Sequence, residues 1–371
     1  MSAPRTVILG AFPPPVGGAA KNNAILHQSL RDAGVEAVKL DTSASTVSHK
    51  RSLRFHAERI RGNTTALVGA RRAARPDATL YFVPNAGSGL WYTLAQVKAV
   101  GARYARLVCH HRSFRYIDEL VGPMQRLTQA FPEKTTHVFL SPGQADGFRA
   151  RYGEVTHLVA SNARYVCDEA AAPVVPRAPG PLRLGHLSNL CREKGFFDVA
   201  DAYEALRREG ADAELHVAGP VVEPEVEPRL AALRAAYGDA VRTHGPLAGA
   251  EKRDFYRGLD VFLFPTRFEQ EAAPNVGYES LAAGVPVLAF DRGCLPEMVS
   301  GESGAVCDRH GDFTAFVLER LAGFSIDDDD RGRRATAIKA SMVEECTRSQ
   351  AQHRALMELL GARDAAVVQE F

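Results

Sequence analysis

The sequence lacks several features that would have assigned it to a class at once. No apolar run reaches eighteen residues, so no membrane-spanning helix is predicted. The N-terminal MSAPRTVILGAFPPP has no charged start followed by an apolar stretch, so no signal peptide is expected and the predicted location is cytoplasmic. The 6 cysteines are sparse and form no CxxC or Cys/His spacing, so we expect most of them to be reduced.

A strong charge of one sign is also absent, because the whole chain sums to +1. The halves differ, however: residues 1–180 hold 23 basic and 12 acidic groups, or +11, and residues 181–371 hold 22 and 32, or −10. Much of the basic excess lies in residues 49–76, where Glu58 is the one acidic residue. The basic residues there are Lys50, Arg51, Arg54, Arg59, Arg61, Arg71, Arg72 and Arg75.

Residues 49–76 suggest a partner of opposite charge. Such a basic segment could attract an anionic membrane surface, by peripheral contact, or a phosphorylated acceptor. A solvated basic helix is the alternative. Nucleic acid is not expected, because no aromatic residues alternate with the cations.

Short β-branched or aromatic runs alternate with segments of helical spacing along the whole chain, which predicts βαβ units and parallel sheets. Two sets of six runs predict an α/β fold with two Rossmann-like domains rather than one large sheet. The expected strands are 6–9, 35–40, 79–83, 106–110, 137–141 and 157–160, then 182–187, 213–218, 241–244, 261–265, 286–290 and 304–307.

Proline marks the expected division between the domains. Four prolines fall within 173–181, a stretch that can continue neither a helix nor a central strand. The predicted layout is an N-terminal domain over 1–170, a linker over 171–181, a second domain over 182–345, and a C-terminal helix over 346–371 that packs back on the first domain. A helix is predicted over 196–207, ended by Gly210, and a long helical region over 331–361.

The most informative segment is FLFPTRFEQEAAPNVGYESLAAGVPVLAF, residues 262–290. A strand runs into a polar loop that holds Glu271, and Pro274 suits the first position of a following helix. The free N–H groups of Asn275 and Val276 would form a phosphate site, and Glu279, further along the helix, would accept hydrogen bonds from hydroxyls. The segment therefore predicts a ligand with a diphosphate and sugar hydroxyls.

Glu271 and Glu279, separated by seven residues and followed by SLAAG and VPVLAF, resemble the paired-glutamate signature of family-four retaining glycosyltransferases. That family has the GT-B fold, two Rossmann-like domains facing a central cleft. The resemblance implies that Glu271 touches the donor sugar and diphosphate, and Glu279 the ribose. The family's usual Phe-Gly pair is replaced here by Ala272-Ala273 and the two residues after them.

The resemblance extends to residues after the expected strand 182–187. Lys194 and Gly195 stand where the family has its Lys-Gly pair, which implies a point charge on the diphosphate. The family's upstream Arg is not at its usual spacing: Ser188 and Asn189 stand there, and Arg192 could substitute for it from the other side.

Two further groups lie in the first domain. Gly17 and Gly18 precede a helix and resemble the loop with which the family approaches the donor diphosphate. His110 and His111 end the fourth strand, where the family often has a donor-contacting His. We expect His110 to be that residue and His111 the second choice, because alternation along a strand sends them to opposite faces.

No metal ligands are predicted. A third ligand near His110 and His111 is not suggested by spacing. The acidic run Asp327 to Asp330 is expected to be a solvated loop rather than a metal-binding DxD motif.

The predicted function is therefore metal-independent transfer of a sugar, with retention, from a nucleoside-diphosphate sugar to an acceptor hydroxyl, with Lys194, Glu271 and His110 as the catalytic group. The donor is a UDP-sugar by default from the family, with a GDP-sugar as the other candidate. A GT-B sugar-nucleotide epimerase and a non-catalytic nucleotide-sugar sensor remain open. A nicotinamide-dependent dehydrogenase is disfavoured, because GxGxxG is missing.

Overall fold

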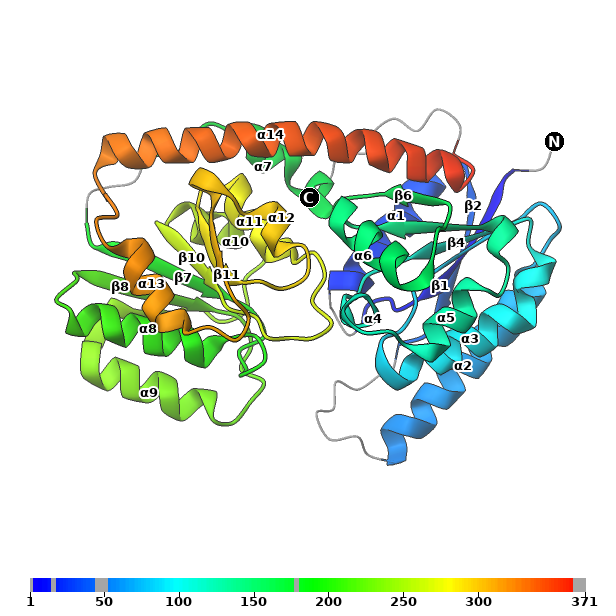
Figure 1. Ribbon diagram of the computed structural model, residues 1–371, viewed down its shortest axis with the longest axis horizontal. Coiled ribbons are helices and arrows are strands. Elements are labelled where there is room, and N and C mark those ends of the chain that lie inside the picture. The colour runs from blue at the N-terminus through cyan, green and yellow to red at the C-terminus, as the bar shows by residue number, and fades with distance from the viewer. Residues whose placement is uncertain (1–2, 15–17, 44–52, 177–179, 363–371) are drawn as a thin grey trace. The chain divides into compact units, whose positions relative to one another are not determined.

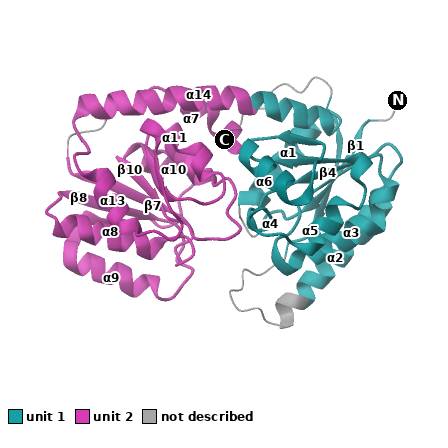
Figure 2. Cartoon of the chain, viewed as in Figure 1, with its two compact units in different colours: residues 1–161, 350–369 teal, residues 162–349, 370–371 magenta. Residues whose placement is uncertain are grey.

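The computed structural model of the chain describes residues 3–14, 18–43, 53–176 and 180–362 and forms two compact units (Figures 1 and 2). Of the described residues, unit 1 comprises those up to Ser161 together with 350–362, and unit 2 comprises those within Asn162–Ser349. Each unit contains one parallel sheet of six strands. All twelve strands predicted from the sequence are present, so the two-domain α/β fold is confirmed.

Unit 1 has the strand order β2-β1-β3-β4-β5-β6. Its strands are β1 (Arg5–Gly10), β2 (Glu36–Asp41), β3 (Thr79–Phe82), β4 (Arg106–His110), β5 (Thr135–Phe139) and β6 (His157–Val159). Its helices are α1 (Gly18–Asp32), α2 (Leu53–Ala73), α3 (Leu90–Val100), α4 (Arg115–Asp118), α5 (Gly122–Thr128) and α6 (Pro142–Tyr152).

The two faces of this sheet are covered by different helices, because successive strand residues point to opposite sides. One face, with Val7 and Leu80, packs against α2, α3, α5 and α6. The other face, with Ile8 and Tyr81, packs against α1 and the end of the last helix. Figure 1 shows α1 on one side of the sheet and α2, α3 and α5 on the other.

Unit 2 has the order β12-β11-β10-β7-β8-β9. Its strands are β7 (Leu182–Leu187), β8 (Ala213–Ala218), β9 (Val241–Thr243), β10 (Val261–Phe264), β11 (Val287–Phe290) and β12 (Gly304–Cys307). Its helices are α7 (Cys167–Ala171), α8 (Phe196–Arg208), α9 (Val226–Tyr237), α10 (Gly249–Arg257), α11 (Asn275–Ala282), α12 (Leu295–Met298), α13 (Phe313–Leu321) and the first part of α14 (Asp328–Leu359).

Helix α8 illustrates why these segments are helical. Phe196, Val199 and Tyr203 recur at helical spacing, and all three are fully buried against the sheet. Gly210, with φ of 88°, follows the helix in the left-handed conformation that ends helices. The predicted helix over 196–207 is thus confirmed to within one residue.

The boundary between the units differs from the predicted linker. Packing divides the chain after Ser161, not near residue 170, and residues 177–179 of the expected linker lie outside the described residues. Residues 162–171 belong to unit 2 because their side chains bond there: Asn162 Nδ2 donates to Ala273 O at 3.0 Å, and Glu169 pairs with Arg257 at 2.7 Å.

Helix α14 contributes to both units, since its residues to Ser349 belong to unit 2 and those from Gln350 to unit 1. Ile338 and Met342 are buried, and Leu356 and Leu360 complete a core of unit 1. In the part of the chain that the structure describes, no helix is long and apolar enough to cross a membrane.

The acidic run was predicted to be a loop, and this is wrong. Asp328, Asp329 and Asp330 form the first turn of α14, where acidic side chains complement the helix dipole. Asp327 Oδ1 accepts the N–H of Asp329 at 2.9 Å and Asp330 pairs with Arg333 at 2.7 Å.

Candidate functional site

The sheet of unit 2 reverses its strand order between β7 and β10. From β7 the chain builds outward through β8 and β9, and from β10 it builds the other way through β11 and β12. The loops that follow β7 and β10 therefore diverge at the carboxyl end of the sheet, which is where open α/β sheets bind ligands. Lys194 lies after β7 and Glu271 after β10.

These two side chains meet. Lys194 Nζ donates to Glu271 Oε2 at 2.6 Å, and Thr266 Oγ1 lies 3.3 Å from the same oxygen. The Lys194 ammonium is also 4.3 Å from the centre of the Phe268 ring. The Lys194 side chain is 21% exposed and the Glu271 side chain 13%. The ion pair is therefore partly shielded from water but still accessible to a ligand.

The backbone after β7 explains the position of Lys194. Gly195 has φ of 83°, and a Cβ there would lie 2.2 Å from the carbonyl oxygen of Pro265. Only glycine allows this approach of the two loops. The N–H of Arg267 donates to the carbonyl of Glu193 at 2.7 Å, which joins the loops a second time.

Glu279 forms a second carboxylate–lysine pair. It lies on α11, and Lys252 of α10 donates to its Oε1 at 2.6 Å. Tyr256, one helical turn after Lys252, donates its hydroxyl to Oε2 at 3.1 Å. Burial, and next the charge of Glu279, raises the pKa of Tyr256 well above its ordinary value, so this hydroxyl remains a donor.

Helix α11 begins at Asn275, so Pro274 is its N-cap rather than its first residue as predicted. The Gly277 N–H donates to the Pro274 carbonyl at 3.1 Å. Among the described residues, the N–H groups of Asn275 and Val276 have no acceptor. They remain the two donors at this helix start that could bind an anion.

The end of β7 holds a buried histidine. His186 Nδ1 donates to the carbonyl of Leu263 at 2.9 Å, so Nε2 accepts from the Ser188 hydroxyl at 2.8 Å. Burial lowers the pKa of His186 to about 4. The hydrogen bond to Leu263 acts to raise this pKa, and the charge of Lys194 lowers it further. The imidazole is therefore neutral at pH 7 and joins β7 to β10.

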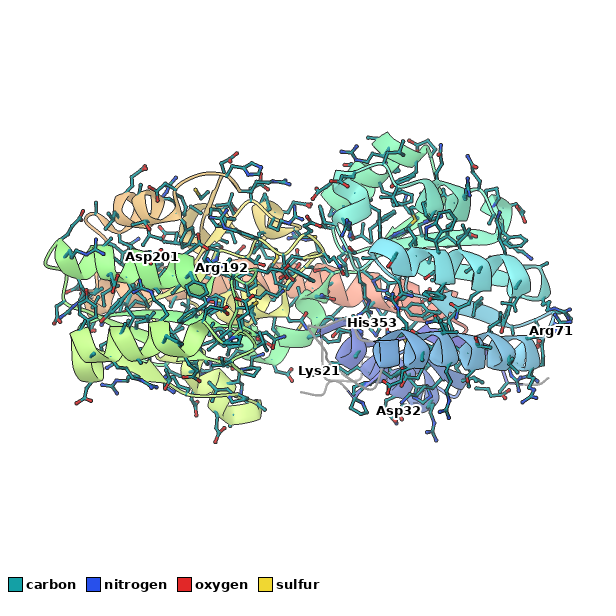
Figure 3. The ribbon with its side chains drawn as sticks, turned by 90° about the horizontal axis from the view of Figure 1, so that it is seen from below. Lys21, Asp32, Arg71, Arg192, Asp201 and His353 are labelled. Carbon is teal, nitrogen blue, oxygen red and sulfur yellow. The ribbon has the colours of Figure 1, made fainter. Side chains whose placement is uncertain are left out.

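Two predicted ligand residues beside Lys194 lie on the surface. Asn189 is exposed, and Arg192, labelled in Figure 3, is exposed with its guanidinium 4.4 Å from the centre of the Phe197 ring. The Arg192 N–H donates to Glu223 Oε2 at 2.9 Å. In this structure, then, the Arg192 side chain stacks on α8 and makes no bond to Glu271.

In unit 1, Gly17 lies outside the described residues, and Gly18 is the first residue of α1. His110 and His111 point to opposite faces of the sheet, as predicted. His110 is 3% exposed, and its Nδ1 hydrogen-bonds the Tyr81 hydroxyl at 2.7 Å. The contact of His110 with a donor sugar remains a prediction.

His111 has no exposed surface, which argues against the predicted donor contact. It lies among aromatic rings, and its Nε2 hydrogen-bonds His137 Nδ1 at 2.8 Å. Burial, with the neighbouring His137 as the smaller cause, keeps the pKa of His111 well below its usual value. In this structure His111 is therefore a buried, neutral imidazole.

Spacing in the sequence did not suggest a third ligand near His111, but the structure brings Cys109 and His137 next to it. Cys109, His111 and His137 bring one ligand atom each to within 4.8 Å of one another, because Cys109 and His137 are register partners in β4 and β5. The two ring nitrogens are closer than the separation of about 3.4 Å that Zn–N bonds of about 2.1 Å require at a tetrahedral ion. In this structure the imidazole rings of His111 and His137 instead form a hydrogen bond with each other.

Sequence reasoning missed Lys252 and Tyr256. Their spacing of four residues places them on one face of α10. That spacing was visible in the sequence, but it could not indicate that this face meets Glu279, which depends on the packing of α10 and α11.

Comparison with known proteins concerns mainly unit 2. Residues 181–322 match the family described as Glycosyl transferases group 1. A protein named as a colanic acid biosynthesis glycosyltransferase, WcaL of Salmonella typhimurium, is 29% identical over 192 residues, 50% of this chain and 46% of that protein. The lipopolysaccharide core biosynthesis mannosyltransferase LpsB of Rhizobium meliloti is 37% identical over 87 residues, 23% of each chain. The chain thus spans less than half the length of these relatives.

Solved structures match nearly the whole chain. A UDP-forming trehalose-phosphate synthase from Burkholderia xenovorans superposes with a TM-score of 0.67 at 12% identity, over 97% of this chain and 100% of the other. The Escherichia coli trehalose-6-phosphate enzyme bound with UDP-2-fluoro glucose gives 0.66 at 12% identity, over 97% and 99%. This likeness confirms the GT-B type of two-domain α/β fold.

Proposed function

We propose that this protein is a retaining, metal-independent glycosyltransferase that moves a sugar from a nucleoside-diphosphate sugar to an acceptor hydroxyl. The observation that carries the proposal is the pairing of Lys194 with Glu271 at the reversal point of the unit 2 sheet. The family match over residues 181–322 supports it. The names of the curated relatives, which concern colanic acid and lipopolysaccharide core, support an acceptor in glycan or glycolipid biosynthesis.

In the proposed donor site, positively charged groups bind the diphosphate and a carboxylate binds the ribose hydroxyls. Lys194 meets the diphosphate, and the N–H groups of Asn275 and Val276 add partial positive charge. Glu279, already an acceptor for Lys252 and Tyr256, accepts the ribose hydroxyls. Glu271, beside Lys194, lies against the sugar and the diphosphate.

The reaction needs little proton transfer to the leaving group. Retaining transfer passes through an oxocarbenium-like state, and negative charge grows on the departing diphosphate. A preorganised cation at that place stabilises the transition state more than the ground state. Lys194 has this place in the proposal, and it is held by the bond to Glu271 and the fixed turn at Gly195.

Nucleotide binding is tested by thermal shift with UDP, GDP, ADP and NAD. A ligand at about a hundred times its Kd adds about 2.7 kcal/mol of stability. We expect UDP or GDP to raise the melting temperature of the wild type and to raise that of Glu279→Gln less. A response to NAD alone would overturn the proposal.

Transfer and its stereochemistry are tested next. The responding nucleotide is supplied as its sugar conjugate with a panel of hydroxyl acceptors, and product is followed by NMR in the presence of EDTA. We expect an unchanged anomeric configuration and full activity with EDTA. Donor consumption that gives only an epimer or free sugar would support the epimerase, and binding without consumption would support the sensor.

A further inference from the structure

Helices α2, α3 and α5 form one outer layer of unit 1. Their inner residues, among them Ala66, Leu94 and Met124, share a single core with the sheet. Gln96 of α3 donates to the carbonyl of Asn63 on α2 at 3.0 Å, so these two helices pack side by side. Figure 3 shows α2 and α3 running next to each other, with Arg71 labelled near the C-terminal end of α2. Their outward residues therefore belong to one surface.

This surface carries exposed apolar side chains. Ile60 and Val68 on α2 are 53% and 43% exposed, and Trp91 on α3 is 50% exposed. They are three of the seven large apolar residues that are exposed in the part of the chain that the structure describes. On α2, exposed positions recur at 60/61, 64/65, 68 and 71/72, a single stripe at helical spacing.

The charges around these apolar side chains are of one sign. The described parts of α2, α3 and α5 contain one acidic residue, Glu58. Among the described residues, none of the exposed cations of these helices has a carboxylate within 4.0 Å. These exposed cations are Arg61, Arg71, Arg72, Lys98 and Arg126. Arg126 lies over Trp91, with its guanidinium 5.5 Å from the ring centre.

We propose that this basic apolar face, formed by Ile60, Arg61, Val68, Arg71, Arg72, Trp91, Lys98 and Arg126, binds the surface of an anionic phospholipid bilayer. Unpaired arginines attract anionic headgroups, and the exposed Trp91, Ile60 and Val68 enter the boundary between headgroups and acyl chains. The sequence indicated only a basic segment over 49–76. The structure adds α3, α5 and the apolar component.

A bilayer accounts for this surface better than a charged polymer does. Long arginine side chains keep their charge among the headgroups while their aliphatic parts cover apolar surface. Ile60 and Val68 are aliphatic and offer no stacking surface to bases, whereas both gain from leaving water for lipid. We therefore expect anionic vesicles to bind this face more tightly than RNA does.

Trp91 provides a direct readout, because it is the single tryptophan of the chain. The chain of residues 1–371 is titrated with phosphatidylcholine vesicles that contain either no or about 30 mol% phosphatidylglycerol, the anionic lipid that gives the vesicle surface a negative potential. We expect the emission to shift to the blue, and to be quenched by brominated acyl chains, with the anionic vesicles alone. Equal response to neutral vesicles, or none to either, would overturn the proposal.

Matched variants locate the contact. Each cation near an anionic surface contributes about fivefold to partitioning, so Arg61→Gln/Arg72→Gln should lower vesicle binding by about 25-fold. The control is Arg31→Gln/Arg354→Gln, which removes two exposed arginines from α1 and α14, on the opposite face of the same sheet. We expect the control to bind within twofold of wild type.

Two further results would contradict the proposal. One is an equal loss of binding in both double variants, which would indicate a response to net charge alone. The other is tighter binding of single-stranded RNA than of anionic vesicles in competition at the same salt concentration. The measurement needs no sugar transfer, so its failure leaves the proposed enzyme activity untouched.

Discussion

Lys194 Nζ lies 2.6 Å from Glu271 Oε2, although the two residues are 77 positions apart in the chain. The bond joins the loops after β7 and β10, the neighbouring strands at which the order of the unit 2 sheet reverses. Lys252 and Glu279 repeat the arrangement at 2.6 Å. The candidate site thus holds two carboxylates, each paired with a lysine. In the proposed reaction, the donor diphosphate would compete with Glu271 for Lys194.

Replacing Lys194 should impair transfer far more than folding. In the proposed mechanism Lys194 faces the leaving diphosphate, so Lys194→Ala should lose about 3 kcal/mol of transition-state stabilisation, or roughly 100-fold in kcat. The melting temperature should change little, because the side chain is 21% exposed and lies on a loop. Steady-state release of nucleoside diphosphate gives kcat. Turnover equal to wild type would exclude Lys194 from the mechanism, and the surface change Arg208→Ala on α8 is the control.

Glu279 should affect donor affinity rather than the chemical step. Glu279→Gln weakens hydrogen bonds from ribose hydroxyls to a charged acceptor, each worth about 1.5–3 kcal/mol, so the KM for donor should rise by at least about tenfold with kcat nearly unchanged. Lys252→Met should also raise the KM for donor, because the ion pair with Lys252 holds the Glu279 carboxylate in place. Lys252→Arg keeps the ion pair and should restore the wild-type KM. An effect confined to kcat would contradict the ribose assignment.

Gly195 should tolerate no side chain. In Gly195→Ala, the left-handed backbone costs about 1–2 kcal/mol and the Cβ meets the backbone carbonyl of Pro265. Gly210→Ala is the matched control, since its φ of 88° is similar but nothing lies within 4 Å of the added Cβ. Urea unfolding should show Gly195→Ala to be less stable than Gly210→Ala by at least about 2 kcal/mol. Equal losses would show that the close approach is unimportant.

His186 should make unit 2 sensitive to acid. The pKa of His186 is lowered from 6.5 to about 4 in the folded protein, so between these values the unfolded chain binds a proton that the folded one does not. Stability from this group is complete above pH 6.5 and falls as the pH drops toward 4, by on the order of 3 kcal/mol. His186→Gln should flatten this decline in urea unfolding, whereas the exposed His310→Gln should not. A parallel pH profile in both variants would contradict the assignment.

The local pattern of residues determined the elements. Short apolar runs such as Val261–Phe264 favour strands because of their length and their β-branched and aromatic residues. The spacing of Phe196, Val199 and Tyr203 favours a helix, because it places all three side chains on one helix face. The loop with Glu271 and the helix with Glu279 were also predictable from the sequence, because the conformation of each is set by neighbours within a few residues.

The tertiary structure decided which of these residues meet. Lys194 pairs with Glu271 because β7 and β10 are adjacent, and sheet order depends on packing between distant segments. The same holds for Lys252 beside Glu279 and for His111 beside His137. The division after Ser161 also escaped prediction, because prolines mark where a chain cannot be regular, whereas a unit boundary is set by the side-chain contacts of residues 162–171.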